Sequence, residues 1–248
     1  ELYCEPTGHF PHNPEPLEEH LKDIMALTKE KVCDLGIVVD PDVDRLALIT
    51  DEGKMFGEEY TLVACADFLL PVKGGNTVSN LSSSRALRDV TQSKGFKYSA
   101  SAVGEVNVVN EMKATHAVIG GEGNGGVILP DLHYGRDALV GVAMILTHLA
   151  KTGKTLSELR ASYPNYKMLK QKIQLDASMD VNALLERVAT SFSNEQVSTI
   201  DGVKVDFDEG WVHLRKSNTE PILRVYAEGR TLEIAEKLVD RMRKVITQ

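Results

Sequence analysis

The sequence predicts an α/β fold followed by a C-terminal antiparallel α+β domain. Over residues 17–160, segments with helical periodicity alternate with short apolar runs, which is the pattern of α/β domains. Over residues 161–248, the predicted order is strand, helix, three strands and a closing helix, which is typical of antiparallel α+β domains. The Tyr163-Pro164-Asn165 stretch marks the expected boundary between the two parts.

The first elements lead to an acidic segment. Residues 17–32 carry apolar side chains at helical spacing, with acidic residues early and lysines late, and predict a helix. The apolar run at 34–40 is typical of a parallel strand buried on both faces. Residues 45–56 predict a hairpin that turns at 51–53. Because ligands in α/β folds bind at the carboxyl ends of strands, the acidic segment after 34–40 is a candidate site.

The remaining elements follow from the same periodicities. In the α/β part we expect helices over 57–70, 83–94, 104–113 and 135–153, and strands over 76–82 and 116–122. In the C-terminal part we expect strands over 166–175, 200–207, 211–217 and 222–228, and helices over 179–192 and 231–247.

Composition excludes several classes of protein. The net charge is −8 and no Lys/Arg cluster alternates with aromatic residues, which argues against nucleic acid as a partner. No apolar run is long enough to span a membrane. The three cysteines are widely spaced, fit neither a disulfide framework nor a zinc site, and predict a cytoplasmic protein. The chain begins at Glu1 without an initiator methionine, so we expect a fragment; the sequence predicts no oligomeric state.

The first candidate site is "DPDVDR", with Asp40, Asp42 and Asp44 at alternate positions before Arg45. Two like charges about 4 Å apart repel by about 4 kcal/mol at an effective dielectric of 20, so the loop requires a cation or solvation. An EF-hand is excluded because Arg45 stands where glycine is needed and Asp51 where glutamate is needed. Mg²⁺ fits better, with Arg45 beside it to meet a phosphate. A polar turn without a metal is the alternative.

The second candidate is the glycine-rich segment 120–126, which contains Glu122 and Asn124. Glycines allow a ligand to approach the backbone, and Glu and Asn are suitable partners for hydroxyl groups. The segment is not a Walker loop because the Gly-Lys-Ser/Thr ending is missing. A glycine-rich hairpin without a ligand remains equally open.

The third candidate is "RKSNTEP", a turn between two predicted strands. Arg215, Ser217, Asn218 and Thr219 place a guanidinium, two hydroxyls and an amide together, which suits a phosphate. Arg224 is expected on the paired strand. An ordinary Ser-Asn-Thr turn is the alternative.

In this order and spacing, "DPDVDR", "GEGNGG" and "RKSNTEP" resemble the α-D-phosphohexomutase superfamily, which includes phosphoglucosamine mutases and phosphomannomutase/phosphoglucomutases. Members of that family have four domains around one cleft. The resemblance covers essentially the whole chain and implies that residues 1–45 end the second domain, 46–160 form the third, and 161–248 form the fourth. It implies a mixed α/β part followed by an antiparallel α+β domain.

The resemblance also implies roles for individual residues. Mg²⁺ would be bound by Asp40, Asp42 and Asp44, with Arg45 lining the cleft beside it. Sugar hydroxyls would be held by Glu122, Asn124 and Glu105. The phosphate that is not transferred would be held by Arg215, Ser217, Asn218 and Thr219, with Arg224 nearby.

The loops depart from the family pattern at two places. Pro41 and Val43 stand between the aspartates where the family usually has glycines, which makes the loop stiffer. The sugar loop continues Asn-Gly-Gly over 124–126, where the family commonly has Ser-Gly-His. The second departure bears on which sugar is bound.

The family's nucleophile is a phosphoserine in a Ser-His-Asn-Pro loop of the first domain. Residues 12–14 match its last three letters, but Pro11 stands in place of the serine. We interpret this stretch as a loop of the second domain, so the resemblance implies a fragment without the nucleophile, and we expect this chain by itself to be catalytically inactive.

The reaction that the resemblance implies moves a phosphoryl group between O6 and O1 of a hexose phosphate, through a phosphoserine enzyme and a hexose 1,6-bisphosphate. Phosphoglucosamine mutase is the first expectation, and phosphomannomutase/phosphoglucomutase is the alternative. An aspartate-nucleophile phosphatase acting through Asp40 is disfavoured because no small hydroxyl residue follows at the expected position. A phosphosugar- and metal-binding module without turnover is the remaining alternative.

Overall fold

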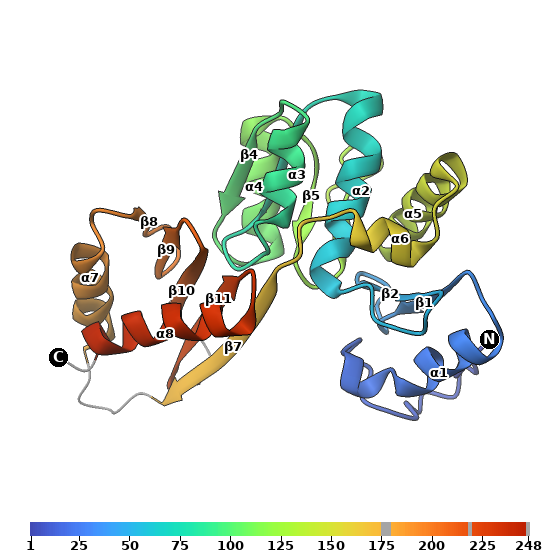
Figure 1. Ribbon diagram of the computed structural model, residues 1–248, viewed down its shortest axis with the longest axis horizontal. Helices are drawn as coiled ribbons and strands as arrows, with labels where there is room; N and C mark the ends of the chain where they lie inside the picture. Colours follow the sequence, from blue (N-terminus) through green and yellow to red (C-terminus); the bar gives the residue numbers. More distant parts are fainter. Residues whose placement is uncertain (175–179, 218–219, 247–248) are drawn as a thin grey trace. The chain divides into compact units, whose positions relative to one another are not determined.

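The computed structural model describes residues 1–174, 180–217 and 220–246 (Figure 1). The chain forms two compact units. The first comprises Glu1–Ala100 with Gly104–Pro164, and the second comprises Ser101–Val103 with Asn165–Gln248. No helix among the described residues is long and apolar enough to cross a membrane.

The first unit begins with a short 3₁₀ turn, Glu18–His20, and helix α1, Lys22–Glu30. Strands β1 (Leu35–Val39) and β2 (Leu46–Thr50) pair antiparallel, with Leu35 opposite Thr50. The expectation of a parallel strand buried on both faces is therefore wrong for β1, and the side chains of Ile37 and Val39 are exposed. The hairpin expected over 45–56 is present with a short second arm: the backbone N–H groups of Thr50 and Phe56 donate to the carbonyl oxygens of Lys54 and Leu48, both at 2.8 Å, and Ile49 and Met55 form an antiparallel bridge.

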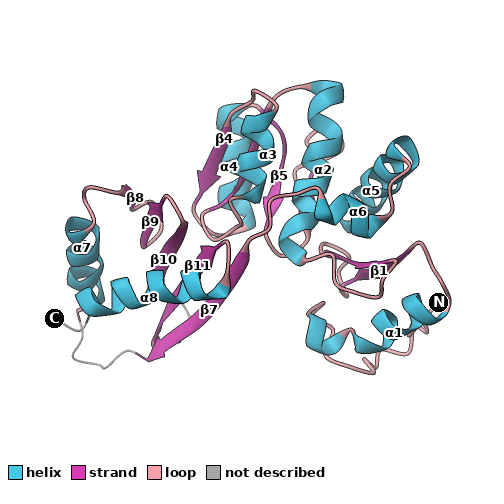
Figure 2. Ribbon diagram, viewed as in Figure 1, coloured by secondary structure: helices cyan, strands magenta, loops and turns pink. Residues whose placement is uncertain are grey.

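A four-stranded sheet with the order β4-β3-β5-β6 forms the centre of the first unit. β3 and β5 are parallel, and β5 and β6 are antiparallel. The strands are β3 Asn76–Asn80, β4 Tyr98–Ser101, β5 Ala117–Glu122 and β6 Gly126–Ile128. The helices are α2 Glu58–Lys73, α3 Ala86–Ser93, α4 Glu105–Thr115, α5 Ala138–Thr152 and α6 Leu156–Ala161 (Figure 2). All four helices expected here are confirmed.

Helix α5 begins and ends where its sequence dictates. The carboxylate of Asp137 accepts hydrogen bonds from the backbone N–H groups of Leu139 and Val140 at 2.8 and 3.1 Å, which caps the helix. Gly153 ends it with φ 68°, a left-handed conformation that glycine adopts without strain. The cap places residue 136, which precedes it, in the loop between β6 and α5.

The second unit is an antiparallel sheet with two helices. Its strand order is β7-β11-β10-β9-β8, and every pair is antiparallel, which confirms the expected α+β architecture. The strands are β7 Lys167–Gln174, β8 Gln196–Ser198, β9 Val203–Phe207, β10 Gly210–Lys216 and β11 Ile222–Gly229. The helices are α7 Val181–Ser191 and α8 Leu232–Ile246. Apolar side chains of β10, β11 and α8, among them Leu214, Val225 and Leu238, form one buried core.

Candidate active site

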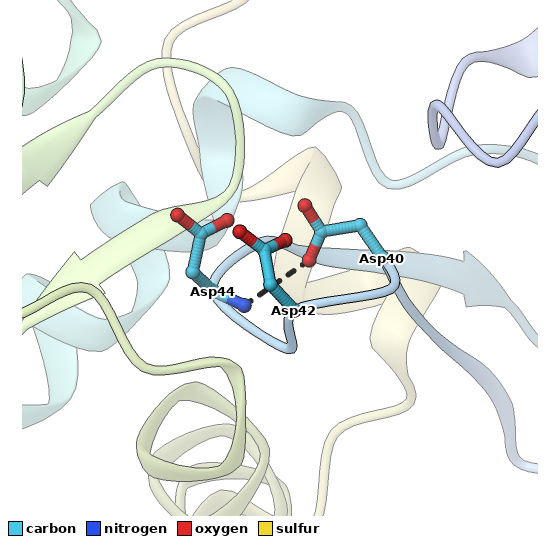
Figure 3. Close-up of side chains that lie close together, drawn as sticks. All are labelled: Asp40, Asp42 and Asp44. Atoms are coloured by element: carbon cyan, nitrogen blue, oxygen red, sulfur yellow. Dashed lines mark hydrogen bonds between the residues drawn. The ribbon is translucent and has the colours of Figure 1, made fainter.

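The loop between β1 and β2 brings three carboxylates together. Oxygen atoms of Asp40, Asp42 and Asp44 all lie within 4.8 Å of one another. Figure 3 shows the three side chains on the same side of the loop. Asp40 is buried, Asp44 is half-buried and Asp42 is exposed. The three carboxylates are therefore close enough together to bind one ion.

The buried carboxylate of Asp40 holds this loop in place through hydrogen bonds. Its Oδ1 accepts hydrogen bonds from the backbone N–H groups of Asp44 at 3.1 Å and Arg45 at 2.9 Å. Its Oδ2 accepts from Arg45 Nε at 2.6 Å. Val43 has a left-handed φ of 59°, which is strained for a β-branched residue and is the conformation that a glycine would adopt freely. Arg45 therefore stands beside the acidic cluster, held by the buried carboxylate.

The carboxylates of the loop differ in their electrostatics. Burial raises the pKa of Asp44 to about 6, against the attraction of Arg136 and with repulsion from Asp40 and Asp42. Burial also opposes ionisation of Asp40, but hydrogen bonds from the backbone and side chain of Arg45 hold its pKa below the usual value. A bound cation reduces the electrostatic repulsion between carboxylates that lie this close together.

The donor set fits a hard divalent cation. Mg²⁺ prefers oxygen ligands and binds through one or a few carboxylates. Asp44 Oδ1 is buried and accepts no hydrogen bond from the described residues, and the nearest paired cation, Arg45 Nε, lies 3.6 Å away. This buried oxygen therefore has lone pairs that a bound cation could use. The residues present therefore fit Mg²⁺.

Arg136 joins the acidic loop to the other acidic residues of the site. Its Nη2 contacts Asp44 Oδ2, its Nη1 lies 2.9 Å from Glu122 Oε2, and its Nε lies 3.0 Å from Glu105 Oε2. Glu122 ends β5 and Glu105 begins α4, so the guanidinium connects three separate segments of the first unit. The sequence analysis missed Arg136, although its position directly before the Asp137 cap could have indicated a loop residue.

Glu122 is the most enclosed carboxylate of the glycine-rich segment. It is 7% exposed, and its Oε1 accepts hydrogen bonds from Asn80 Nδ2 at 2.8 Å and the Gly104 backbone N–H at 3.3 Å. Asn124 instead accepts a hydrogen bond from the Gly126 backbone N–H at 3.2 Å and stabilises its own turn. The segment is thus a hairpin between β5 and β6 that also places Glu122 beside Asp44 through Arg136.

Glycines suit this hairpin because other segments of the same chain approach it closely. Gly125 has φ 90°, and a Cβ there would collide with the Leu46 carbonyl oxygen. A Cβ at Gly123 would collide with the Glu59 carboxylate. The Leu46 backbone N–H also donates to the Gly125 carbonyl oxygen at 3.1 Å. The strand that follows the acidic loop and the glycine-rich hairpin are therefore held in direct contact.

In the second unit, the predicted phosphate loop lies between β10 and β11. Arg215 and Arg224 are directly opposite each other in the register, so their side chains share one face of the sheet, as expected for the paired strand. Arg215 Nε donates to both oxygens of Asp201, at 3.0 and 2.8 Å. Ser217 Oγ accepts from the Glu220 backbone N–H at 3.3 Å. Asn218 and Thr219 lie outside the described residues.

Asp201 was also missed by the sequence analysis. It falls within the strand expected over 200–207, but β9 begins only at Val203, so Asp201 lies in the turn between β8 and β9. Arg224 Nε is buried and donates no hydrogen bond within the described part of the chain. Its guanidinium lies 3.7 Å from Glu220 Oε2.

Comparison with known proteins gives consistent matches along the chain. The family described as phosphoglucomutase/phosphomannomutase matches through its alpha/beta/alpha domain II at residues 1–53, its alpha/beta/alpha domain III at 57–166, and its C-terminal domain at 168–245. A phosphoglucomutase/phosphomannomutase of Thermococcus kodakarensis is 37% identical over 239 residues, covering 95% of this chain and 52% of the relative. A phosphoglucosamine/phosphogalactosamine mutase of Sulfurisphaera tokodaii is 31% identical, covering 94% and 52%.

Solved structures agree with these matches. The crystal structure of a phosphoglucomutase/phosphomannomutase family protein from Burkholderia thailandensis superposes with a TM-score of 0.82 at 26% identity, covering 95% of this chain and 51% of that one. This chain spans about half the length of the relatives it matches. The chain therefore belongs to the phosphoglucomutase/phosphomannomutase family of α-D-phosphohexomutases.

Proposed function

We propose that the chain is part of a phosphohexomutase that moves a phosphoryl group between O6 and O1 of a hexose phosphate. The reaction would proceed through a phosphoserine on the enzyme and a hexose 1,6-bisphosphate. The observation that carries the proposal is the contact of Arg136 with Asp44 on one side and Glu122 on the other, because it joins a metal-binding loop to a hydroxyl-binding hairpin. The relatives are named as mutases, which supports the same reaction.

Each group of residues would have one task. Asp40, Asp42 and Asp44 would hold Mg²⁺, whose charge stabilises the transferring phosphoryl group. Glu122 is held by Asn80 and Arg136 and would accept hydrogen bonds from sugar hydroxyls, with Glu105 and Asn124 as the further candidates. The Arg215 loop, with Ser217, Asn218, Thr219 and Arg224, would bind the phosphate that is not transferred.

The substrate proposed first is glucosamine phosphate, and mannose and glucose phosphates are the alternatives. The relative from Sulfurisphaera tokodaii is named for amino sugars, whereas that from Thermococcus kodakarensis is named for glucose and mannose. For the 248-residue chain alone we propose binding of phosphosugar without turnover, since its matches are to domains II, III and IV of the family and the nucleophilic serine of the family belongs to the first domain.

The reaction is tested in the full-length enzyme with a panel of hexose 1-phosphates. Asp42→Asn is expected to lower kcat by about 100-fold or more, because it removes a ligand of the charge-stabilising ion. Asp34→Asn, at the exposed other end of β1, is the matched control and is expected to retain activity. Full turnover by the Asp42 variant would show that the metal assignment is wrong.

Binding by the chain alone is tested separately by calorimetry with glucosamine 6-phosphate and mannose 6-phosphate. Binding of either sugar without conversion supports the proposed role of this part. A mutase activity of the 248-residue chain would contradict it.

A further inference from the structure

Arg136 divides its guanidinium among three carboxylates. Nε pairs with Glu105, Nη1 with Glu122 and Nη2 with Asp44, so each nitrogen meets a carboxylate from a different segment. Only 18% of the Arg136 side chain is exposed, and the side chains of Glu122, Asp44 and Glu105 are 10%, 18% and 35% exposed. Interactions this far from bulk water are weakly screened and geometrically strict.

The position of Arg136 is fixed from both ends. Its stem lies against the glycine-rich hairpin, where a Cβ at Gly126 would collide with Arg136 Cδ. Asp137, the next residue, caps α5, and the backbone N–H of Ala138 donates to the Val43 carbonyl oxygen at 3.0 Å. The backbone two residues after Arg136 is therefore hydrogen-bonded to the acidic loop whose Asp44 the arginine contacts.

Charge balance shows why a cation is needed at this point. Asp44, Glu105 and Glu122 lie around Arg136, Asp42 lies close to Asp44, and Arg45 is already bound to Asp40 at 2.6 Å. Among these described side chains, carboxylates outnumber guanidinium groups. Because Arg136 Nη2 contacts the carboxylate of Asp44, a divalent cation on that aspartate would meet the guanidinium at close range.

We propose that Arg136 is a positioning residue that competes with the divalent cation for Asp44 while holding Glu105 and Glu122 in place. This inference rests on the proposed function. Two positive charges that share one carboxylate repel each other, so occupation by the metal weakens the Asp44–Arg136 contact. The coupling is reciprocal, and removal of Arg136 therefore strengthens metal binding. With metal bound to the loop, Arg136 would pair only with Glu105 and Glu122, the two carboxylates proposed to contact the sugar.

The test measures binding of Mn²⁺ and Mg²⁺ alone to the 248-residue chain by calorimetry. Arg136→Met keeps the aliphatic stem and removes the charge. It is expected to tighten metal binding by about tenfold, which corresponds to the Coulomb repulsion between a divalent and a univalent charge a few ångströms apart at the dielectric constant of water. Arg136→Lys retains the charge and is expected to bind metal within about threefold of the wild type. Arg88→Met removes the same charge from α3, where Arg88 pairs with Asp89, and is the control.

The outcomes separate the inference from the function on which it rests. A purely structural role for Arg136 predicts weaker metal binding in the methionine variant, because the loop would lose its order, and this result or an unchanged affinity overturns the inference alone. If the wild-type chain binds neither ion, the metal assignment in the proposed function fails together with the inference. Should Arg136→Met not fold by circular dichroism, Arg136→Gln, which keeps a hydrogen-bond donor, replaces it with the same expected tightening.

Discussion

Two aspartates of the acidic loop are expected to differ in how much the same substitution lowers the stability of the first unit. Asp40 is buried and accepts three hydrogen bonds, from the Asp44 and Arg45 backbone and from Arg45 Nε. Asp42 is exposed and accepts no hydrogen bond from the described residues. Asp40→Asn should therefore destabilise the metal-free first unit, whereas Asp42→Asn should not.

The magnitude follows from the atoms that change. Asparagine retains Oδ1 for the two backbone donors, but its amide N–H₂ would face Arg45 Nε, so the charge-assisted bond is lost. A hydrogen bond to a charged group contributes about 1.5–3 kcal/mol. The Arg45 side chain is 29% exposed, so water replaces part of this interaction, and we expect a loss of about 2 kcal/mol. Asp42→Asn should remain within about 0.5 kcal/mol of the wild type.

The assay is urea unfolding of the 248-residue chain in the presence of a chelator, followed by circular dichroism and tryptophan fluorescence. The protein has a single tryptophan, Trp211, which is buried in the second unit and reports on that unit alone. A loss of about 2 kcal/mol shifts a transition by about 1 M urea at the slope typical of a domain of this size. The dichroism transition of the first unit should move by this amount, and the fluorescence transition should remain in place.

The reasoning is refuted if Asp40→Asn leaves the dichroism transition within about 0.2 M urea of the wild type. It is equally refuted if Asp42→Asn causes the same shift, because the two carboxylates would then have one common role. A shift of the fluorescence transition alone would also refute it, because the substitution would then destabilise the second unit and not the first.

Three further predictions concern other parts of the chain. Burial lowers the pKa of His213 from 6.5 to about 4, so between these pH values the ring is neutral in the native state and protonated in the unfolded state. The free energy of unfolding of the second unit should therefore be highest above pH 6.5 and should fall by about 3 kcal/mol toward pH 4. His213→Gln should remove this loss in urea titrations followed by tryptophan fluorescence. Asp201→Asn should raise KM for hexose phosphate about tenfold in the full-length enzyme, because Asp201 orients Arg215, and an unchanged KM would exclude this role. Gly125→Ala should lower the free energy of unfolding of the first unit by about 2–4 kcal/mol. Gly8→Ala is the control, because Gly8 also has a left-handed φ, of 76°, but has no neighbour near its Cβ, and it should lower this free energy by about 1 kcal/mol. Equal losses in the two variants would contradict the argument from close approach.

Local patterns predicted most elements because their causes are local. The start of α5 follows from the Asp137 cap and its end from Gly153, both of which act within one turn of the helix. The apolar run of β1 gave the strand but not its pairing, since a short apolar run is compatible with parallel and antiparallel neighbours alike. Burial of β1 was overestimated for the same reason: Ile37 and Val39 are exposed in the two-stranded pairing with β2.

The sequence by itself predicted three candidate segments: the aspartates at 40, 42 and 44, the glycine-rich segment with Glu122, and the turn after Arg215. Only the tertiary structure showed that the Arg136 guanidinium pairs with both Asp44 and Glu122 in the first unit, and that Asp201 pairs with Arg215 in the second. The reason is physical. Spacing along a strand or loop fixes the direction of neighbouring side chains, whereas a guanidinium can pair with any carboxylate in the chain, and folding alone selects the partner.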